Sequence, residues 1–139
     1  MSVTRSATGR AFAAFLPPEV PRCFVDEDLR LSRSSQTSEA VQRATFESEV
    51  EQARKRGIAR CANAEPSPVH CIAVNAFSVP IRDQEERMVM ALTVASQATR
   101  LSPDPDGEVP ARLAQAAAGI EKRLQEMPDA GVPVYPPAP

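Results

Sequence analysis

The sequence predicts an α+β fold in which helices pack on an antiparallel β-sheet. Three observations carry this prediction: a helix-forming segment near the N-terminus, two alternating apolar runs joined by a short polar connector, and a long amphipathic segment after them. The chain has 139 residues, of which 42% are hydrophobic, enough for one domain with a buried core. We assign this domain to residues 1–127 and interpret the proline-rich residues 128–139 as a disordered tail.

The first helix is expected to begin near Ser6 or Thr8, because either side chain can accept a hydrogen bond from the first free backbone amides. It should end at Pro17. Its apolar side chains follow the i, i+3, i+4 spacing of one helix face: Phe12, Phe15 and Leu16.

Residues 19–43 have mixed polarity, a proline and a serine-rich run, and we predict short helical turns and loop there. A second helix around Phe46 should end at Gly57. Its acidic residues precede the basic residues 54–56, an order that suits the helix dipole. We interpret the basic triplet as a solvated helix end, with a nucleic-acid contact as the alternative.

Residues 61–68 contain two prolines and are predicted to be a loop. Residues 71–81 and 88–95 alternate in the manner of strands, and the polar residues 83–87 suit the turn of an antiparallel hairpin. Because Pro80 cannot donate to a strand ladder, it should lie near a strand end or face away from a partner.

The last helix is predicted to start at Pro110, a residue favoured in a first helical turn. Four apolar residues repeat at steps of four and three along it and define one face: Leu113, Ala117, Ile120 and Leu124. The helix should end before Pro128.

Charge, hydropathy and cysteine content exclude several functional classes. Sixteen basic and 18 acidic residues give a net charge of −2, which does not provide the basic face of a nucleic-acid-binding protein. No apolar run approaches the roughly 20 residues of a membrane span, and the N-terminus does not resemble a secretory leader. The three cysteines form no C-x-x-C motif, which favours a reducing cytoplasm and neither a disulfide scaffold nor a metal site.

Four stretches, taken in order, resemble the effector-binding domain of the IclR family of bacterial transcription regulators. They are residues 6–17 (SATGRAFAAFLP), 46–59 (FESEVEQARKRGIA), 74–83 (VNAFSVPIRD) with 90–95 (MALTVA), and 113–124. The resemblance implies a GAF-like α+β domain that senses a small metabolite and self-associates as a dimer or tetramer. Family members carry further strands and a DNA-binding winged helix before the first stretch. We therefore expect a domain that is incomplete at its N-terminus and contacts DNA only through a missing winged helix.

The resemblance also implies a pocket for a small effector, commonly a carboxylate. The residues at matching positions are small or carry a hydroxyl: Ala7, Thr8, Gly9, Ala76, Thr93 and Ala95. The first three begin a helix, where free backbone amides and the helix dipole favour an anion, and Thr93 can donate to a carboxylate. Ala95 stands where some members have a second hydroxyl. Capping with tight packing for the first three, and strand propensity for Thr93, remain structural alternatives.

We expect no enzymatic activity, cofactor, metal or membrane partner. One alternative is a cysteine-dependent enzyme that uses Cys61 and His70. His70 and Cys71 are neighbours whose side chains point to opposite faces of a strand, so they cannot pair with each other. The other alternative is a remnant without function. The sequence specifies neither the effector nor the regulated genes.

Overall fold

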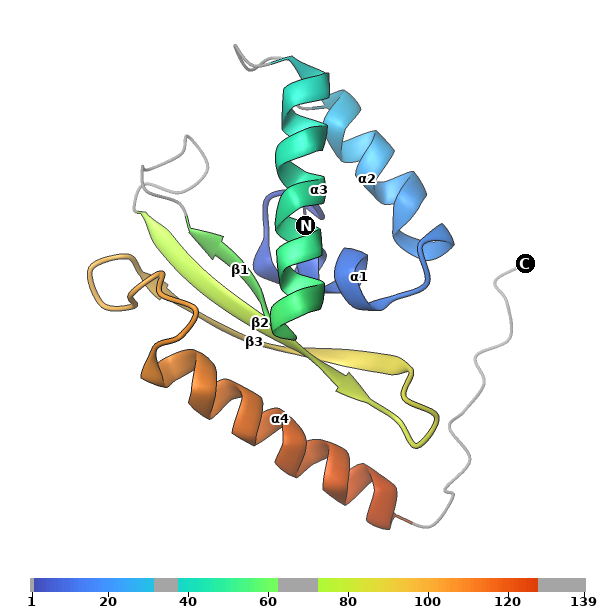
Figure 1. The fold of residues 1–139 in the computed structure, drawn as a ribbon, viewed down its shortest axis with the longest axis vertical. Coiled ribbons are helices and arrows are strands. Elements are labelled where there is room, and N and C mark those ends of the chain that lie inside the picture. Colours follow the sequence, from blue (N-terminus) through green and yellow to red (C-terminus); the bar gives the residue numbers. More distant parts are fainter. Residues whose placement is uncertain (1, 32–37, 63–72, 128–139) are drawn as a thin grey trace.

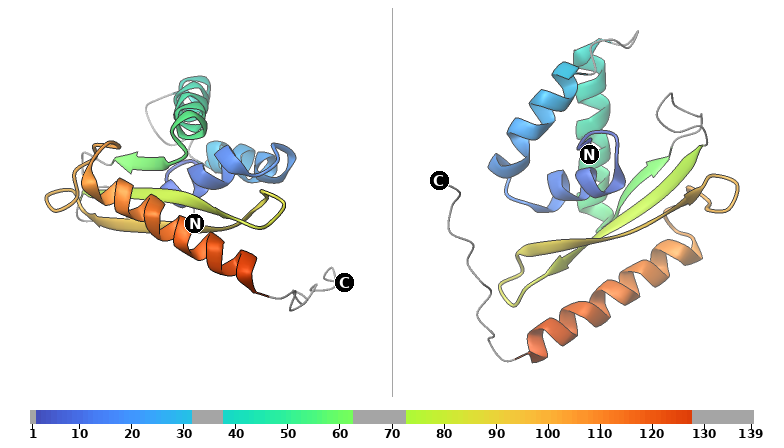
Figure 2. Two further views of the ribbon diagram at one scale, coloured as in Figure 1. Left: turned by 60° about the horizontal axis from the view of Figure 1, so that its bottom comes forward. Right: turned by 180° about the vertical axis from the view of Figure 1, so that it is seen from behind.

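The computed structural model describes residues 2–31, 38–62 and 73–127. Its elements are α1 (Ala7–Phe15), α2 (Glu19–Leu31), α3 (Glu39–Arg56), β1 (Ala59–Ala62), β2 (Val74–Arg82), β3 (Met88–Gln97) and α4 (Glu108–Glu126). In the described part of the chain the strands form one antiparallel sheet in the order β1-β2-β3. Figures 1 and 2 show α1, α2 and α3 on one side of this sheet and α4 on the other. The predicted α+β class is confirmed.

The central strand β2 is covered on both faces, so both of its alternating sets of side chains are buried. Val79 and Ile81 pack with Ala117 of α4, whereas the hydroxyl of Ser78 points to the α1 side. Partly buried side chains complete the α4 layer: Ile58, Leu92, Leu113, Ile120 and Leu124. The predicted apolar face of the last helix is thus the one that packs on the sheet.

Helix α1 begins as predicted, with Ser6 as its N-cap: the Ser6 side chain accepts a hydrogen bond from the Gly9 amide at 3.0 Å. Its most buried side chains are alanines and not the predicted aromatic stripe, since Ala11 is 0% exposed while Phe12 and Phe15 are only half-buried. Methyl groups keep the helix close to the sheet and to α3. The aromatic rings fill the margin of this contact.

The prediction of loop and short turns is wrong for residues 19–31 and 39–43, and residues 32–37 lie outside the described residues. Residues 19–31 form the three-turn helix α2, which accommodates Pro21 because a proline in the first turn removes no intrahelical hydrogen bond. Helix α3 begins at Glu39, earlier than its apolar pattern indicates, after Ser38 as N-cap. It ends as predicted at Gly57, whose φ of 74° is the left-handed conformation that glycine adopts without strain.

Three boundaries also differ from prediction. The first part of the predicted loop 61–68 belongs to β1, which pairs Ala59–Ala62 with residues 75–78. Strand β3 continues two residues beyond the predicted end, and α4 begins at Glu108, two residues before Pro110. The hairpin turn at 83–87 is confirmed, and Pro80 lies beyond the end of β1. The rest of the predicted loop, the first residues of the predicted strand 71–81 and the proline-rich segment lie outside the described residues (63–72 and 128–139).

Candidate functional site

Three hydroxyl groups meet between the start of α1 and the middle of the sheet. Thr93 Oγ1 lies 2.8 Å from Thr8 Oγ1 and 2.9 Å from Ser78 Oγ. Thr8 belongs to the first turn of α1, and Ser78 and Thr93 are direct partners in the β2–β3 register. Ser78 is fully buried, whereas Thr93 is exposed. This hydroxyl row (Thr8, Thr93 and Ser78) therefore runs from the interior to the surface.

The hydroxyl row has one proton more than its own contacts use. Three hydroxyls carry three protons, and the two contacts among the described residues consume two of them. Either hydroxyl can be the donor between Ser78 and Thr93, but burial favours Ser78, because leaving its proton without an acceptor would cost about 1–3 kcal/mol. The remaining proton then belongs to Thr8 or Thr93, at the accessible end of the row. An anion placed there would receive a charge-assisted hydrogen bond.

The start of α1 is packed under the N-terminal segment. The hydroxyl of Ser6 donates to the carbonyl of Ser2 at 2.6 Å, which folds residues 2–6 over the first turn. A Cβ atom at Gly9 would overlap the backbone of Val3, so Gly9 permits this close approach. Tight packing therefore explains Gly9 and also the burial of Ala7. A ligand contact by Ala7 or Gly9 stays a prediction.

The two predicted alanines lie beside the hydroxyl row. Ala76 and Ala95 are direct partners in the β2–β3 register, two positions along from Ser78 and Thr93 and therefore on the same face of the sheet. Ala76 is half-buried and Ala95 is exposed. Their methyl groups leave room beside Thr93 without adding a donor. The structure thus brings the predicted residues of α1, β2 and β3 to one face of the sheet.

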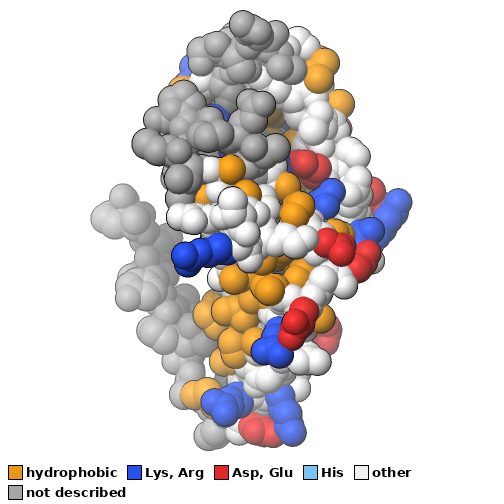
Figure 3. All heavy atoms as spheres, turned by 90° about the vertical axis from the view of Figure 1, so that its left-hand side faces the viewer, with side chains coloured by type: hydrophobic (Ala, Val, Ile, Leu, Met, Phe, Trp, Pro, Cys, Tyr) orange, Lys and Arg blue, Asp and Glu red, His pale blue; other side chains and the backbone are white. Residues whose placement is uncertain are grey.

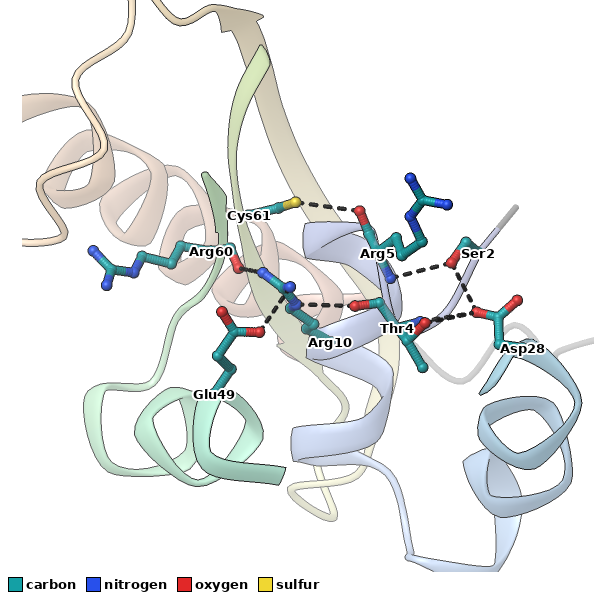
Figure 4. Close-up of polar contacts among 8 residues, drawn as sticks. All are labelled: Ser2, Thr4, Arg5, Arg10, Asp28, Glu49, Arg60 and Cys61. Carbon is teal, nitrogen blue, oxygen red and sulfur yellow. Dashed lines mark hydrogen bonds and ion pairs between the residues drawn. The ribbon is translucent and has the colours of Figure 1, made fainter. Parts of the chain in front are cut away.

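Arg10 joins the start of α1 to three other parts of the chain (Figure 4). Its Nε donates to the Thr4 carbonyl at 3.2 Å, and its Nη1 donates to the Arg60 carbonyl of β1 at 2.7 Å. Its Nη2 forms an ion pair with Glu49 Oε2 of α3 at 2.7 Å. Sequence reasoning missed this residue, because one arginine in a helix of small residues carries no signal of tertiary contacts.

The other end of α1 is held by Arg54 of α3. Its guanidinium donates from Nε to the Ala14 carbonyl at 3.1 Å and from Nη2 to the Ala13 carbonyl at 3.2 Å. These carbonyls belong to the last turn of α1, where no intrahelical amide is available to them. Arg54 thus caps α1 across the helical layer, and both ends of α1 are tied to α3.

Asp28 of α2 anchors the N-terminal segment (Figure 4). Its Oδ2 accepts hydrogen bonds from Ser2 Oγ at 2.8 Å and from the Thr4 amide at 2.9 Å. Burial raises the pKa of this carboxyl, but the hydrogen bonds from the amides and hydroxyls of residues 2–4 outweigh burial, and the net pKa is lowered from its usual value. Asp28 therefore holds residues 2–6 over the hydroxyl end of α1 as a carboxylate.

Comparison with known proteins shows the family to which the chain belongs. The sequence model of the bacterial transcriptional regulator IclR C-terminal family matches residues 1–122. The chain belongs to this family. The predicted resemblance to IclR effector-binding domains is confirmed. No curated protein matches the sequence.

Solved IclR-type structures share the fold. HmgR of Pseudomonas aeruginosa is 26% identical, with a TM-score of 0.66 over 89% of this chain and 45% of that chain. The IclR of Thermotoga maritima is 23% identical, with a TM-score of 0.60 over 88% of this chain and 47% of that chain. The inducer-binding domain of PobR from Acinetobacter is 20% identical, with a TM-score of 0.61 over 86% of this chain and 65% of that chain. The chain spans about half the length of HmgR and of the Thermotoga protein.

The basic triplet of this IclR C-terminal domain makes local and tertiary contacts. Besides the contact of Arg54 with α1, Arg56 pairs with Asp106 at 2.9 Å, and Lys55 lies 3.8 Å from Glu51. On the face shown in Figure 3, basic and acidic side chains are interspersed and form no single basic patch. Lys55 is thus solvated as interpreted, whereas Arg54 and Arg56 make tertiary contacts that the interpretation did not include.

The residues of the alternative, a cysteine-dependent enzyme, are described only in part. Cys61 is buried in β1, and its thiol lies 3.2 Å from the Arg5 carbonyl, to which it donates. His70 and Cys71 lie outside the described residues, so the structure does not test the pairing of Cys61 with His70. Within 2–31, 38–62 and 73–127, no group of His, Cys, Asp or Glu is arranged to hold a metal ion. None of the helices in that part of the chain has the length and apolarity to cross a membrane.

Proposed function

We propose that this IclR C-terminal domain is the cytoplasmic sensing and self-association module of a transcription regulator, that it binds a small carboxylate, and that it catalyses no reaction. The spare proton of the hydroxyl row carries the proposal, because it provides a donor at an accessible position beside small side chains. We propose residues 1–127 as this domain. The DNA contacts of such a regulator would come from a winged helix outside these residues.

Two further observations support a carboxylate effector. The donors that the hydroxyl row offers to a ligand are neutral hydroxyls. Arg10 in the first turn of α1 is already paired with Glu49 (Figure 4). Neutral donors form stronger hydrogen bonds with an ionised acceptor than with a neutral one. The PobR inducer-binding domain was solved, as a double mutant, in complex with 3-hydroxybenzoic acid. A hydroxybenzoate is therefore a reasonable first probe, together with small 2-oxo acids.

The test is calorimetric titration of the wild-type chain and of Thr93→Val with these acids. Removing the hydroxyl while keeping the side-chain shape should weaken binding by about five- to a hundredfold, the range for one hydrogen bond to a charged group of about 1–3 kcal/mol. Thr93→Ser retains the hydroxyl and should restore most of the affinity. Thr45→Val, an exposed position on α3, is the matched control and should bind as the wild type does.

Because the buried Ser78 hydroxyl is hydrogen-bonded to that of Thr93, Thr93→Val also removes this partner from Ser78 and should lower stability. Affinity must therefore be measured where the variant is folded, as judged by circular dichroism. Equal affinity in wild type and Thr93→Val would remove Thr93 from the site. Failure of the wild-type chain to bind any acid of the panel would contradict carboxylate sensing by this domain.

This chain by itself should not bind duplex DNA specifically. Specific binding requires groove contacts and neutralised phosphates, and the net charge of −2 opposes the second. A gel-shift titration at physiological salt should show no discrete complex with any operator sequence. Sub-micromolar, salt-tolerant binding of one defined sequence would contradict this expectation.

A further inference from the structure

Helices α2 and α3 diverge and enclose a hollow between them. Figures 1 and 2 show the two helices converging at one end, and α1 lies between their separated ends. The hollow has a volume of about 390 Å³, within the roughly 300–1,000 Å³ range of small-molecule sites. The buried side chains of its lining are apolar and include Ala13, Val25, Phe46 and Val50. This α2–α3 hollow is therefore suited to an apolar group.

Three charged side chains of the lining have partners within the domain. Toward the convergent end, Arg43 of α3 pairs with Asp26 of α2 at 2.9 Å and joins the two helices. Toward α1, the guanidinium of Arg54 donates to the carbonyls of Ala13 and Ala14. These charges are already compensated, so recognition of a charged ligand depends on the side chains between them.

Two further charged side chains line the hollow between these contacts: Arg22 of α2 and Glu47 of α3. Within the described part of the chain neither one forms an ion pair or a hydrogen bond through its side chain. Each lies four residues from an opposite charge on its own helix, namely Asp26 and Arg43, but those two pair with each other across the helices. The two helices thus present opposite, uncompensated charges to one hollow.

We propose that the α2–α3 hollow binds a free α-amino acid with an apolar side chain. Arg22 pairs with its carboxylate, for which a guanidinium offers two parallel donors. Glu47 pairs with its ammonium group, and its side chain packs on the buried apolar lining. A zwitterion satisfies both free charges at once. A simple carboxylate would leave Glu47 unpaired and near a like charge, which disfavours it.

This site is distinct from the hydroxyl row and goes beyond the proposed function. Thr8 of the hydroxyl row lies in the first turn of α1, whereas Ala13, which lines the hollow, belongs to its last turn. An amino acid held by both α2 and α3 would fix the separation of these helices, between which α1 ends. The domain would then receive two chemically different ligands at opposite ends of one helix.

Calorimetric titration of the whole chain with L-leucine and with three truncated analogues tests the proposal. The analogue 4-methylpentanoic acid lacks the amino group, 3-methylbutylamine lacks the carboxylate, and glycine lacks the apolar side chain. L-leucine should bind saturably with one site per chain. Each analogue should bind at least about tenfold more weakly, because it leaves one charge of the hollow or its apolar lining without a partner.

Two single substitutions locate the site. Arg22→Gln and Glu47→Gln should each weaken L-leucine binding at least about tenfold, since each removes one charge-assisted contact. Both residues are exposed, so both variants should fold, as judged by circular dichroism. Arg30→Gln on α2 and Glu126→Gln on α4 are the matched controls. Both are exposed positions outside the lining of the hollow and should bind L-leucine as the wild type does.

A cross-test separates this site from the hydroxyl row. Thr93→Val should leave L-leucine affinity unchanged, and Arg22→Gln should leave the affinity for hydroxybenzoate unchanged. Loss of L-leucine binding in Thr93→Val would move the amino acid to the hydroxyl row and overturn the second site. A wild type that binds neither L-leucine nor L-phenylalanine at millimolar concentration overturns it as well, as does equal affinity for an analogue that lacks one charge. Failure to bind the carboxylates alone contradicts only the proposed function.

Discussion

The two faces of the β-sheet are held by different chemistry. On the α4 face the contact is a layer of aliphatic side chains around Val79, Ile81 and Ala117. On the α1 face the buried alanines are supplemented by directional polar contacts: the hydroxyl row, Arg10, Arg54 and Asp28. Hydrophobic burial is nondirectional, whereas hydrogen bonds require fixed geometry. The face that already positions hydroxyl donors is therefore the one suited to recognise a ligand.

The largest expected effect comes from the aliphatic face. Ile81 is 3% exposed, and Ile81→Ala should lower the free energy of unfolding by about 2–5 kcal/mol through lost burial and the cavity it leaves. Urea denaturation measures this change. Val109→Ala, at a position 40% exposed on α4, should stay within about 0.5 kcal/mol. If both variants lose equal stability, the α4 layer is not the core that its burial indicates.

Gly9→Ala tests the packing of the α1 face. Alanine is the better helix former by about 1 kcal/mol, yet its Cβ would overlap the Val3 backbone, so the variant should lose about 1–3 kcal/mol by overpacking. Gly119→Ala on α4 is the matched control, because nothing lies within 4 Å of the added carbon. It should gain stability in the same thermal or urea melts. Stabilisation of both variants would show that residues 2–6 do not pack tightly on α1.

The smallest expected effect is the pH dependence of Asp28. Its folded pKa is lowered from 3.8, so as pH falls the unfolded chain takes up the proton first and unfolding becomes more favourable. The stabilisation is complete above the unfolded pKa and is lost as pH falls through the folded pKa. Solvent screening keeps it below about 1 kcal/mol. The stability difference between wild type and Asp28→Asn should be present at neutral pH and shrink in acid; a difference independent of pH would contradict this role.

Helix α2 and strand β1 show where local pattern fails to predict the fold. Pro21 and the polar residues around it suggested irregular structure, but Pro21 lies in the first turn, and every fourth residue from it is buried against the helical layer: Pro21, Val25 and Leu29. Strand β1 has the sequence ARCA, which has little strand propensity of its own. It forms because its backbone pairs with that of β2, and because Ala59 and Cys61 are buried in the core.

The accessible part of the candidate site was predictable, and its buried end was not. The start of α1 and the strand carrying Thr93 follow from capping and alternation, and the resemblance to the family selected them. Ser78 was missed because the hairpin contains an irregularity between Ile81 and Arg82. Arg82 pairs with Met88, and a regular ladder continued from that pair would place Ser78 opposite Leu92. The shift of one residue places it opposite Thr93, and turn length alone does not reveal such a shift.

The polar contacts at the two ends of α1 also couple the position of α3 to movements of α1. Glu49 and Arg54 attach the C-terminal half of α3 to α1, while its first ten residues meet α2 through the buried Phe46 and the ion pair of Arg43 with Asp26. Ten helical residues span roughly 15 Å, so a tilt of about 5° at the attachment moves the far end by about 1 Å. A small rotation of α1 would therefore be amplified at the end of α3 distant from the hydroxyl row.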